Sequence, residues 1–568
     1  MKGVHRVFTM KTLCEISMKS SFLKENKKWI CLMTLIMMLQ LVVASYFCIQ
    51  KQGMHYDEYY SYYSSNVTYG LAPTNREWKN VDEIRSEFMV REGEGFRYGL
   101  VKTMQSFDVH PPLYYMVLHT VCSFFPGVFS KWFGLGLNLV LFAICYALIG
   151  YLSYHVFHKK KEIAMVTCLL FGLQVGVLSG ITFIRMYMML TMWCLLAIIW
   201  HIPTWKDKMK LTVKNAFFLW ALVTLGFLTH YYFVVFLFFL AAYTCLYNWL
   251  VRKDFKGSVL YGIIVCLGMG TAVIYYPSCL SHIFRGYRGT EATGAFFDLG
   301  NTVFRIRFFT DLMNQSVFGG ALWILLIIVL VLYVTVRYQS KNRKKLLAVV
   351  QEHQGIAHIA FVTAGYFLVV AKTALLNAEE ANRYELPIYG FCMMLMVAAV
   401  YYLLQELKTC LEAKHSEEER QQSGSKAKTL ISFIAGLCFG LVLTAQVLAL
   451  TQGKVQFLYQ DDAVNVAWAK EHKDSAVVFL YNPNNTWMIW DESEELMQYD
   501  KIYFASLTEE TPLQDKELQL ADEIYVYTSR MDQAEMLMND LIESNPKLEN
   551  KEMIRELLYF DLYRLSSD

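Results

Sequence analysis

The sequence has 568 residues, of which 55% are hydrophobic and only 18% are charged, and its mean hydropathy is positive at +0.29. Soluble domains carry about 25% charged residues, so this composition excludes an ordinary soluble protein. The net charge of +2 offers no basic field for nucleic acid, and the thirteen cysteines form no CxxC pair, which argues against a zinc site or a disulfide framework.

The first predicted element is a membrane anchor. An apolar run at about residues 29–48 follows Lys24, Lys27 and Lys28, and it lacks an A-x-A cleavage pattern. About 20 apolar residues are enough to cross a bilayer. We therefore predict an uncleaved signal anchor, with residues 1–28 in the cytoplasm.

A long loop at about residues 50–131 follows the anchor and contains two unusual motifs. The first, HYDE from His55, places the adjacent carboxylates of Asp57 and Glu58 beside the membrane, where charge is costly unless it has a function. The second, FDVHPPL from Phe107, has two prolines that fix the backbone at a helix entry. We predict that these prolines hold Asp108 and His110 rigidly above the membrane.

The apolar segment that begins at these prolines, residues 111–126, is the next predicted element. It contains about 15 residues before Pro126 and Gly127, which is shorter than a spanning helix requires. We predict an interfacial or re-entrant helix on the same face as the loop.

Ten more apolar runs are predicted to span the membrane. They lie at about 132–156, 162–182, 187–203, 213–229, 232–250, 258–277, 317–337, 354–372, 387–405 and 429–451. Basic residues cluster in alternate gaps between the runs, at Lys159–Lys161, Lys206–Lys214, Arg252–Lys256, Lys341–Lys345 and Lys408–Lys428. Basic loops stay in the cytoplasm, so the remaining gaps face outside. Counting 111–126 as a further span would reverse every later loop.

The last segment, residues 452–568, is more polar and predicts a small α/β domain. β-rich runs at 476–481, 501–505, 523–528 and 557–565 alternate with helical patterns at 461–470 and 532–544. The predicted fold is therefore a multi-pass α-helical protein of about 11 transmembrane helices, covering 29–451, with an extracytoplasmic C-terminal domain. We expect it in a cell membrane, the bacterial plasma membrane, with its N-terminus in the cytoplasm.

Further unusual residues fall in the gaps that charge assigns to the outer face. Arg185 and Tyr187 lie between the third and fourth spans, and His230 lies between the fifth and sixth. Lys372 ends the ninth span, and Arg383 and Tyr384 precede the tenth. An aromatic belt is the more frequent explanation for a histidine such as His230, and snorkelling is the alternative for each cation. Cations that gather at one membrane interface are suited to binding a phosphate group, because arginine offers paired hydrogen bonds and lysine a point charge.

These motifs, in this order, resemble the integral-membrane glycosyltransferases of the C-type (GT-C) fold. That family includes the protein O-mannosyltransferases and the lipid A aminoarabinose transferase. The FDVHPPL element is very similar to the mannosyltransferase pattern, and the resemblance covers roughly residues 29–405. His110 stands where the aminoarabinose transferase has a lysine, so the acceptor chemistry of that enzyme is not supported.

The resemblance implies transfer of a sugar from a polyprenyl-phosphate donor to an acceptor outside the membrane, with inversion. Asp57 would be the catalytic base and Glu58 would orient Asp57 or the acceptor. The substrate-binding residues would be Asp108, His110, Arg185, Tyr187, His230, Lys372, Arg383 and Tyr384. A divalent metal is left open, with Asp57, Asp108 and His110 as candidate ligands. The acceptor is left open among a lipid, a protein and a cell-wall glycan.

Two alternatives stay open at this point, a transporter or flippase for a lipid-linked glycan and an oligosaccharide ligase. A transporter requires ionisable residues at the middle of its spans, and the predicted spans contain almost none. A ligase would share the donor but would not predict the Asp-Glu and His-Pro-Pro elements. An intramembrane protease is disfavoured because neither a GxGD nor an HExxH motif occurs.

Overall fold

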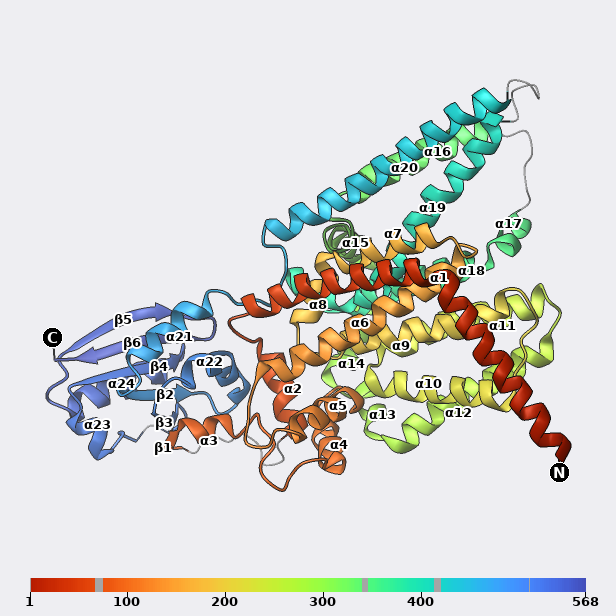
Figure 1. Ribbon diagram of the computed structural model, residues 1–568. Coiled ribbons are helices and arrows are strands. Elements are labelled where there is room, and N and C mark those ends of the chain that lie inside the picture. The colour runs from red at the N-terminus through yellow and green to blue at the C-terminus, as the bar shows by residue number, and fades with distance from the viewer. Residues whose placement is uncertain (1, 67–74, 340–345, 413–419, 510, 568) are drawn as a thin grey trace.

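The structure is a computed structural model that describes residues 2–66, 75–339, 346–412, 420–509 and 511–567. A bundle of helices forms most of the molecule, and a mixed β-sheet lies at one end of it (Figure 1). The basic cluster Lys341–Lys345 and residues 413–419 of the Lys408–Lys428 gap lie outside the described residues.

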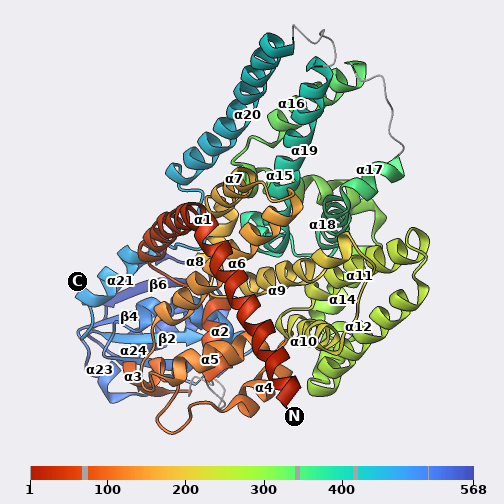
Figure 2. The ribbon, with the colours of Figure 1, turned by 45° about the vertical axis from the view of Figure 1, so that its right-hand side comes forward.

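Eight of the described helices are long and apolar enough to span a membrane. They are α1 (Lys2–Gln50, through its part Asn26–Gln50), α6 (Lys131–Val156), α11 (Tyr232–Leu250), α12 (Phe255–Tyr275), α16 (Leu322–Gln339), α18 (Gln354–Thr373), α19 (Leu386–Glu412) and α20 (Arg420–Thr451, through Lys426–Thr451). The chain is therefore a multi-span membrane protein. In Figures 1 and 2, α16, α19 and α20 lie together as a group on one side of the bundle.

The eleven predicted runs are mostly helical, but four differ from a simple span. The run 317–337 starts at the end of α15 (Thr302–Phe318), crosses the non-helical residues 319–321 and continues in α16. The run 162–182 is broken into α7 (Lys161–Gly172) and α8 (Val175–Thr182), which meet at 54° and would make a ninth span. The helices α9 (Tyr187–Trp200) and α10 (Val213–Thr229) are shorter. At 1.5 Å per residue they are about 21 and 26 Å long, less than the roughly 30 Å of a hydrocarbon core.

The loop after α1 folds into short elements around the two motifs. They are α2 (Tyr56–Asn66), β1 (Glu77–Asn80), α3 (Val81–Arg85), α4 (Tyr98–Ser106) and α5 (Leu113–Ser123). The predicted segment 111–126 is indeed a short helix, because α5 begins directly after Pro112 and ends at Ser123. It packs against α2, α4 and α6.

The sheet has the strand order β1-β3-β2-β4-β6-β5. The strands β2 (Ala476–Tyr481), β3 (Lys501–Ser506) and β4 (Glu523–Ser529) are parallel, while β5 (Asn550–Glu556), β6 (Phe560–Ser566) and β1 pair antiparallel. The predicted run 557–565 is wrong in its bounds, since its first residues form the turn before β6. Neither β5 nor β1 was predicted, because both are polar and lack hydrophobic alternation.

The two faces of the sheet pack against different partners. Successive side chains of a strand point to opposite faces. Val478 and Leu480 of β2 pack with Leu537 of α24 (Asp532–Ser544), whereas Phe479 belongs to the continuous core shared with the helical bundle. The C-terminal domain is thus joined to the bundle by an apolar core and by the β1 strand.

The remaining elements connect these parts. They are α13 (Ser278–Phe284), α14 (Tyr287–Phe297), α15 (Thr302–Phe318), α17 (Leu346–Glu352), α21 (Asp462–Glu471), α22 (Ser493–Leu496), α23 (Lys516–Leu520) and the 3-10 turns η1 (Ile202–Trp205), η2 (Leu299–Asn301), η3 (Ala378–Tyr384) and η4 (Thr486–Glu492). The predicted helices 461–470 and 532–544 correspond to α21 and α24.

Candidate active site

Asp57 lies in the first turn of α2, between two buried arginines. Its Oδ1 is 3.9 Å from Nη2 of Arg185, and its Oδ2 is 3.5 Å from Nη1 of Arg383. The side chain of Asp57 is 26% exposed, whereas those of Arg185 and Arg383 are only 3% and 4% exposed. The two arginines are thus buried cations, and the Asp57 carboxylate between them is partly exposed at the surface.

Each arginine comes from a break between helices. Arg185 lies between α8 and α9, where its Nη1 donates to the carbonyl of Asp57 and to Ser61 Oγ at 3.1 and 3.3 Å. Arg383 lies in η3, and its guanidinium is 5.0 Å from the ring of Phe183. The Nε atoms of both arginines have no hydrogen-bond partner among the described residues. Because buried donors are normally satisfied, these two N–H groups are suited to a further anion.

The charge state of Asp57 follows from this environment. Burial raises its pKa, but the guanidinium groups of Arg185 and Arg383 outweigh burial and hold the pKa below its ordinary value. Burial lowers the pKa of the neighbouring His55 to about 3, so this imidazole is neutral near pH 7. Asp57 is therefore an ionised carboxylate at neutral pH.

Asp108 and His110 join the same site as a hydrogen-bonded pair. The Oδ2 of Asp108 is 2.8 Å from Nδ1 of His110, and Nη2 of Arg185 is 3.5 Å from Nε2 of the same ring. Because an arginine can only donate, the second contact favours the tautomer in which Nδ1–H donates to Asp108. Burial raises the pKa of Asp108, but His110 outweighs it and the pKa is lowered.

Three aromatic side chains extend the site from Arg383 to His110. The ring of Tyr187 is 5.4 Å from that of His230 and 5.8 Å from that of Tyr384, and His230 is 6.0 Å from His110. Burial, with His110 and Arg185 nearby, lowers the pKa of His230 well below its ordinary value. The structure thus brings together eight of the ten predicted residues.

Glu58 lies beside Asp57 in sequence but points into the protein. It is fully buried, with Oε2 2.8 Å from Nζ of the equally buried Lys51. Its two oxygens also accept from the backbone N–H groups of His55 and Ile184 at 2.8 and 2.7 Å. Both carboxylate oxygens of Glu58 therefore bind groups within the protein. The structure does not support the predicted contact between Glu58 and an acceptor.

Lys372 also has partners of its own. Its Nζ donates to the carbonyl of Asp298 at 2.6 Å, to Thr302 Oγ1 at 3.0 Å and to Asn301 Oδ1. All three belong to residues 298–302, and within the described chain no hydrogen bond joins Lys372 to Asp57 or the arginines. This lysine holds η2 against the end of α18.

Sequence reasoning missed Lys51, Gln456 and Phe457, which also lie around the site. Lys51 follows an apolar run and Gln456 and Phe457 lie in a linker, so no motif marks them. Among the residues that the structure describes, no group of three or more His, Cys, Asp or Glu side chains could hold a metal ion. Asp57 faces the guanidinium groups of Arg185 and Arg383, and Asp108 and His110 face each other.

No protein-family model and no curated protein matches the chain. Two solved structures to which it is similar are those of ArnT from Cupriavidus metallidurans, bound to undecaprenyl phosphate and in the apo state. Their identities are 10% and 11%, they cover 94% and 95% of this chain and 98% of the ArnT chain, and both TM-scores are 0.48. The roles of individual residues rest on the contacts described above and not on these matches.

Proposed function

We propose that the protein is a glycosyltransferase that moves a sugar from a polyprenyl-phosphate donor to an acceptor hydroxyl. The observation that carries this proposal is the position of Asp57, half-buried between Arg185 and Arg383. A base requires a carboxylate within reach of the acceptor, and a phosphate leaving group requires fixed positive charge. The site supplies both within one cluster.

In the proposed reaction, Asp57 accepts the proton of the acceptor hydroxyl. The acceptor oxygen forms a bond to the anomeric carbon, and the bond between that carbon and the phosphate oxygen breaks. Polyprenyl phosphate leaves with the electron pair of the broken bond, and Arg185 and Arg383 stabilise the negative charge that develops on it. One displacement by a single carboxylate base inverts the configuration.

The other residues receive supporting roles. Asp108 and His110 border the sugar on the α5 side, and Tyr187, His230 and Tyr384 border it on the α9 side. Glu58 orients Asp57 through the backbone of His55, and Lys372 holds the η2 loop. No metal ion is assigned a role, because the guanidinium groups supply the positive charge that a metal would otherwise provide.

The location of the ionisable groups supports an enzyme over a transporter. Asp57 lies at the start of α2, Arg185 lies between α8 and α9, and Arg383 lies in η3 before α19. All are at helix ends, whereas a transporter binds its substrate near the middle of its spans. We place the site on the outer face of a cell membrane because the basic loops occupy the opposite gaps.

The test is a membrane assay with a polyprenyl-phosphate-linked radioactive sugar, comparing the wild type with Asp57→Asn. The variant keeps the shape of the side chain and removes its basicity, so we expect a loss of about 10²- to 10⁴-fold in kcat. Asp522→Asn is the matched control, since Asp522 forms an exposed pair with Lys547 in the C-terminal domain. Full transfer activity in Asp57→Asn would contradict the proposal.

A further inference from the structure

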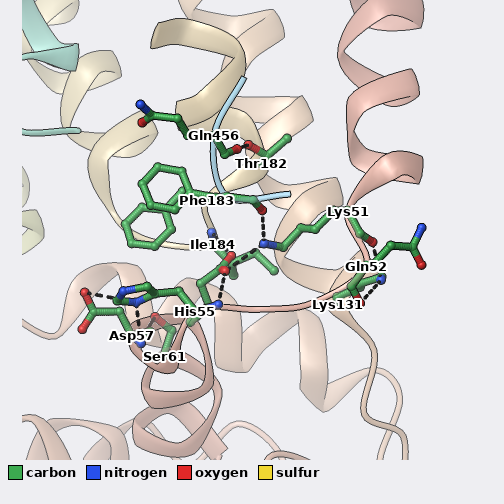
Figure 3. A network of polar contacts seen from close by, with 12 residues as sticks. Lys51, Gln52, His55, Asp57, Ser61, Lys131, Thr182, Phe183, Ile184 and Gln456 are labelled. Atoms are coloured by element: carbon green, nitrogen blue, oxygen red, sulfur yellow. Dashed lines mark hydrogen bonds and ion pairs between the residues drawn. The ribbon is translucent and has the colours of Figure 1, made fainter. Parts of the chain in front are cut away.

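Gln456 lies in the segment that joins α20 to the C-terminal domain, and each of its polar groups is bonded. Its N–H donates to Ser179 Oγ at 3.1 Å, and its carbonyl accepts from Thr182 Oγ1 at 2.9 Å (Figure 3). Its side-chain oxygen accepts from Asn382 Nδ2, and its Nε2 donates to Glu379 Oε2 at 3.3 Å. One glutamine thus bridges α8 and η3.

The residues that Gln456 contacts are close in sequence to the two arginines of the site. Ser179 and Thr182 are in α8, whose end leads directly to Arg185, and Asn382 immediately precedes Arg383. Asn382 is itself buried and accepts from Tyr389 through its carbonyl at 2.8 Å. The segments that carry Arg185 and Arg383 are therefore linked by the side chain and backbone of one residue, Gln456.

Phe457, the next residue along the chain, also contacts segments of the site. Its ring stacks on that of Phe183 with centroids 4.1 Å apart, and Phe183 is also the ring beneath Arg383. Its carbonyl accepts from Lys51 Nζ at 2.6 Å, and Lys51 pairs with Glu58. The φ of Phe457 is +61°, a conformation that favours glycine. Such backbone persists only where the surroundings impose it, and it clusters at functional sites.

We propose that Gln456 is a positioning residue that sets the spacing of Arg185 and Arg383 for the donor phosphate. The segment 456–457 thereby makes the linker to the C-terminal domain part of the donor site. This inference rests on the proposed function, since it assigns the arginines to a phosphate. A shift of about 1 Å in a binding group can cost about 100-fold in rate, so a small change in the spacing has a large effect.

The experiment measures the affinity of the purified full chain for undecaprenyl phosphate in nanodiscs. Gln456→Met keeps the side-chain volume and removes both side-chain hydrogen bonds, and we expect it to weaken binding about tenfold. In an Arg383→Ala background, the same substitution should change affinity less than about twofold. A residue that acts through Arg383 has no further effect once Arg383 is absent, whereas independent effects multiply.

A control separates positioning from general stability. Gln446 of α20 is also buried, and its Nε2 donates to the carbonyls of Leu170 and Val317, both at 2.9 Å. Gln446→Met should lower the Tm without a comparable loss of affinity. If Gln456→Met does not fold, Asn382→Ala breaks the same contact from the η3 side and should give the same non-additivity with Arg383→Ala.

The outcomes separate this inference from the function on which it rests. Binding by the wild type with unchanged affinity in folded Gln456→Met would overturn only the positioning role. Equal losses from Gln456→Met with and without Arg383 would also overturn it. If the wild type does not bind undecaprenyl phosphate, the proposed function and this inference fall together.

Discussion

Asp57 is held as a weak base by the two cations that are proposed to bind the donor. Its lowered pKa reflects the guanidinium groups of Arg185 and Arg383, which outweigh its burial. A bound phosphate would share those guanidinium charges, so the pKa of Asp57 would rise and its basicity would increase.

This arrangement predicts a pH dependence. Because the folded-state pKa of Asp57 is depressed, its charged form persists above that pKa and is lost only as the pH falls through it. We expect Arg383→Gln to raise the pKa of Asp57, since one of the two lowering charges is removed. The acid limb of kcat/KM for the donor should then move to higher pH.

The measurement is the profile of kcat/KM from about pH 3 to about pH 8 for both forms, a range that begins below the ordinary carboxyl pKa of about 4. Arg530→Gln serves as the control, because Arg530 lies in the C-terminal domain and pairs with Asp561 at 3.0 Å. An acid limb that does not move in Arg383→Gln, or that moves equally in Arg530→Gln, would contradict the electrostatic role.

At the scale of elements, the site is assembled from helix ends rather than helix interiors. α2 begins beside the end of α1, the α8–α9 break supplies Arg185, and η3 supplies Arg383. The buried Lys51–Glu58 pair joins three of these pieces, because Glu58 also accepts from the backbone of Ile184 and Lys51 donates to Phe457. A charge buried at this junction is tolerated only because it is paired and hydrogen-bonded.

Removing one partner of this pair should therefore be costly. Lys51→Met leaves the Glu58 carboxylate buried without its cation, and we expect a loss of about 3–5 kcal/mol in the free energy of unfolding. The double variant Lys51→Met/Glu58→Gln should recover much of that loss. The check is the Tm of each variant in detergent.

The matched control is Lys501→Met, which removes an ion pair of Lys501 with Glu517 that is about half exposed. Exposed pairs are worth about 0–1 kcal/mol, so its Tm should be nearly unchanged. A Lys51→Met variant as stable as Lys501→Met would show that the buried pair does not hold the junction together.

At the scale of the whole molecule, the sidedness of the membrane protein is the main prediction. If the basic gaps are cytoplasmic, the sheet domain and the Asp57 cluster face outside. We expect a cysteine introduced by Asn484→Cys, in the exposed turn after β2, to react with an impermeant maleimide on intact cells. Labelling is measured relative to the parent chain, whose native cysteines are mostly buried.

Lys159→Cys is the matching control, because Lys159 is exposed in the first basic gap, between α6 and α7. It should react only after the cells are broken open. The reverse pattern, with residue 159 labelled on intact cells and residue 484 only after lysis, would overturn the predicted orientation.

The membrane class, the helical runs and most members of the site could be predicted from the sequence alone. Hydrophobic length and charge are local properties, so apolar runs can be found from the sequence, and eight of the described helices are indeed long and apolar enough to span a membrane. The Asp-Glu and His-Pro-Pro motifs marked Asp57, Asp108 and His110 because charge and paired prolines beside a membrane are unusual. The core strands β2, β3 and β4 were visible from their apolar runs.

How these segments contact one another could be learned only from the three-dimensional structure. β1 pairs with β3 across more than 400 positions of sequence, and its four residues, of which only Trp78 is apolar, carry no strand signal of their own. Glu58 and Lys372, which the motifs placed with the substrate, have partners within the protein, whereas Gln456 gained a place in the site. Hydrogen bonds and ion pairs between distant segments depend on three-dimensional proximity, and a linear pattern does not contain that information.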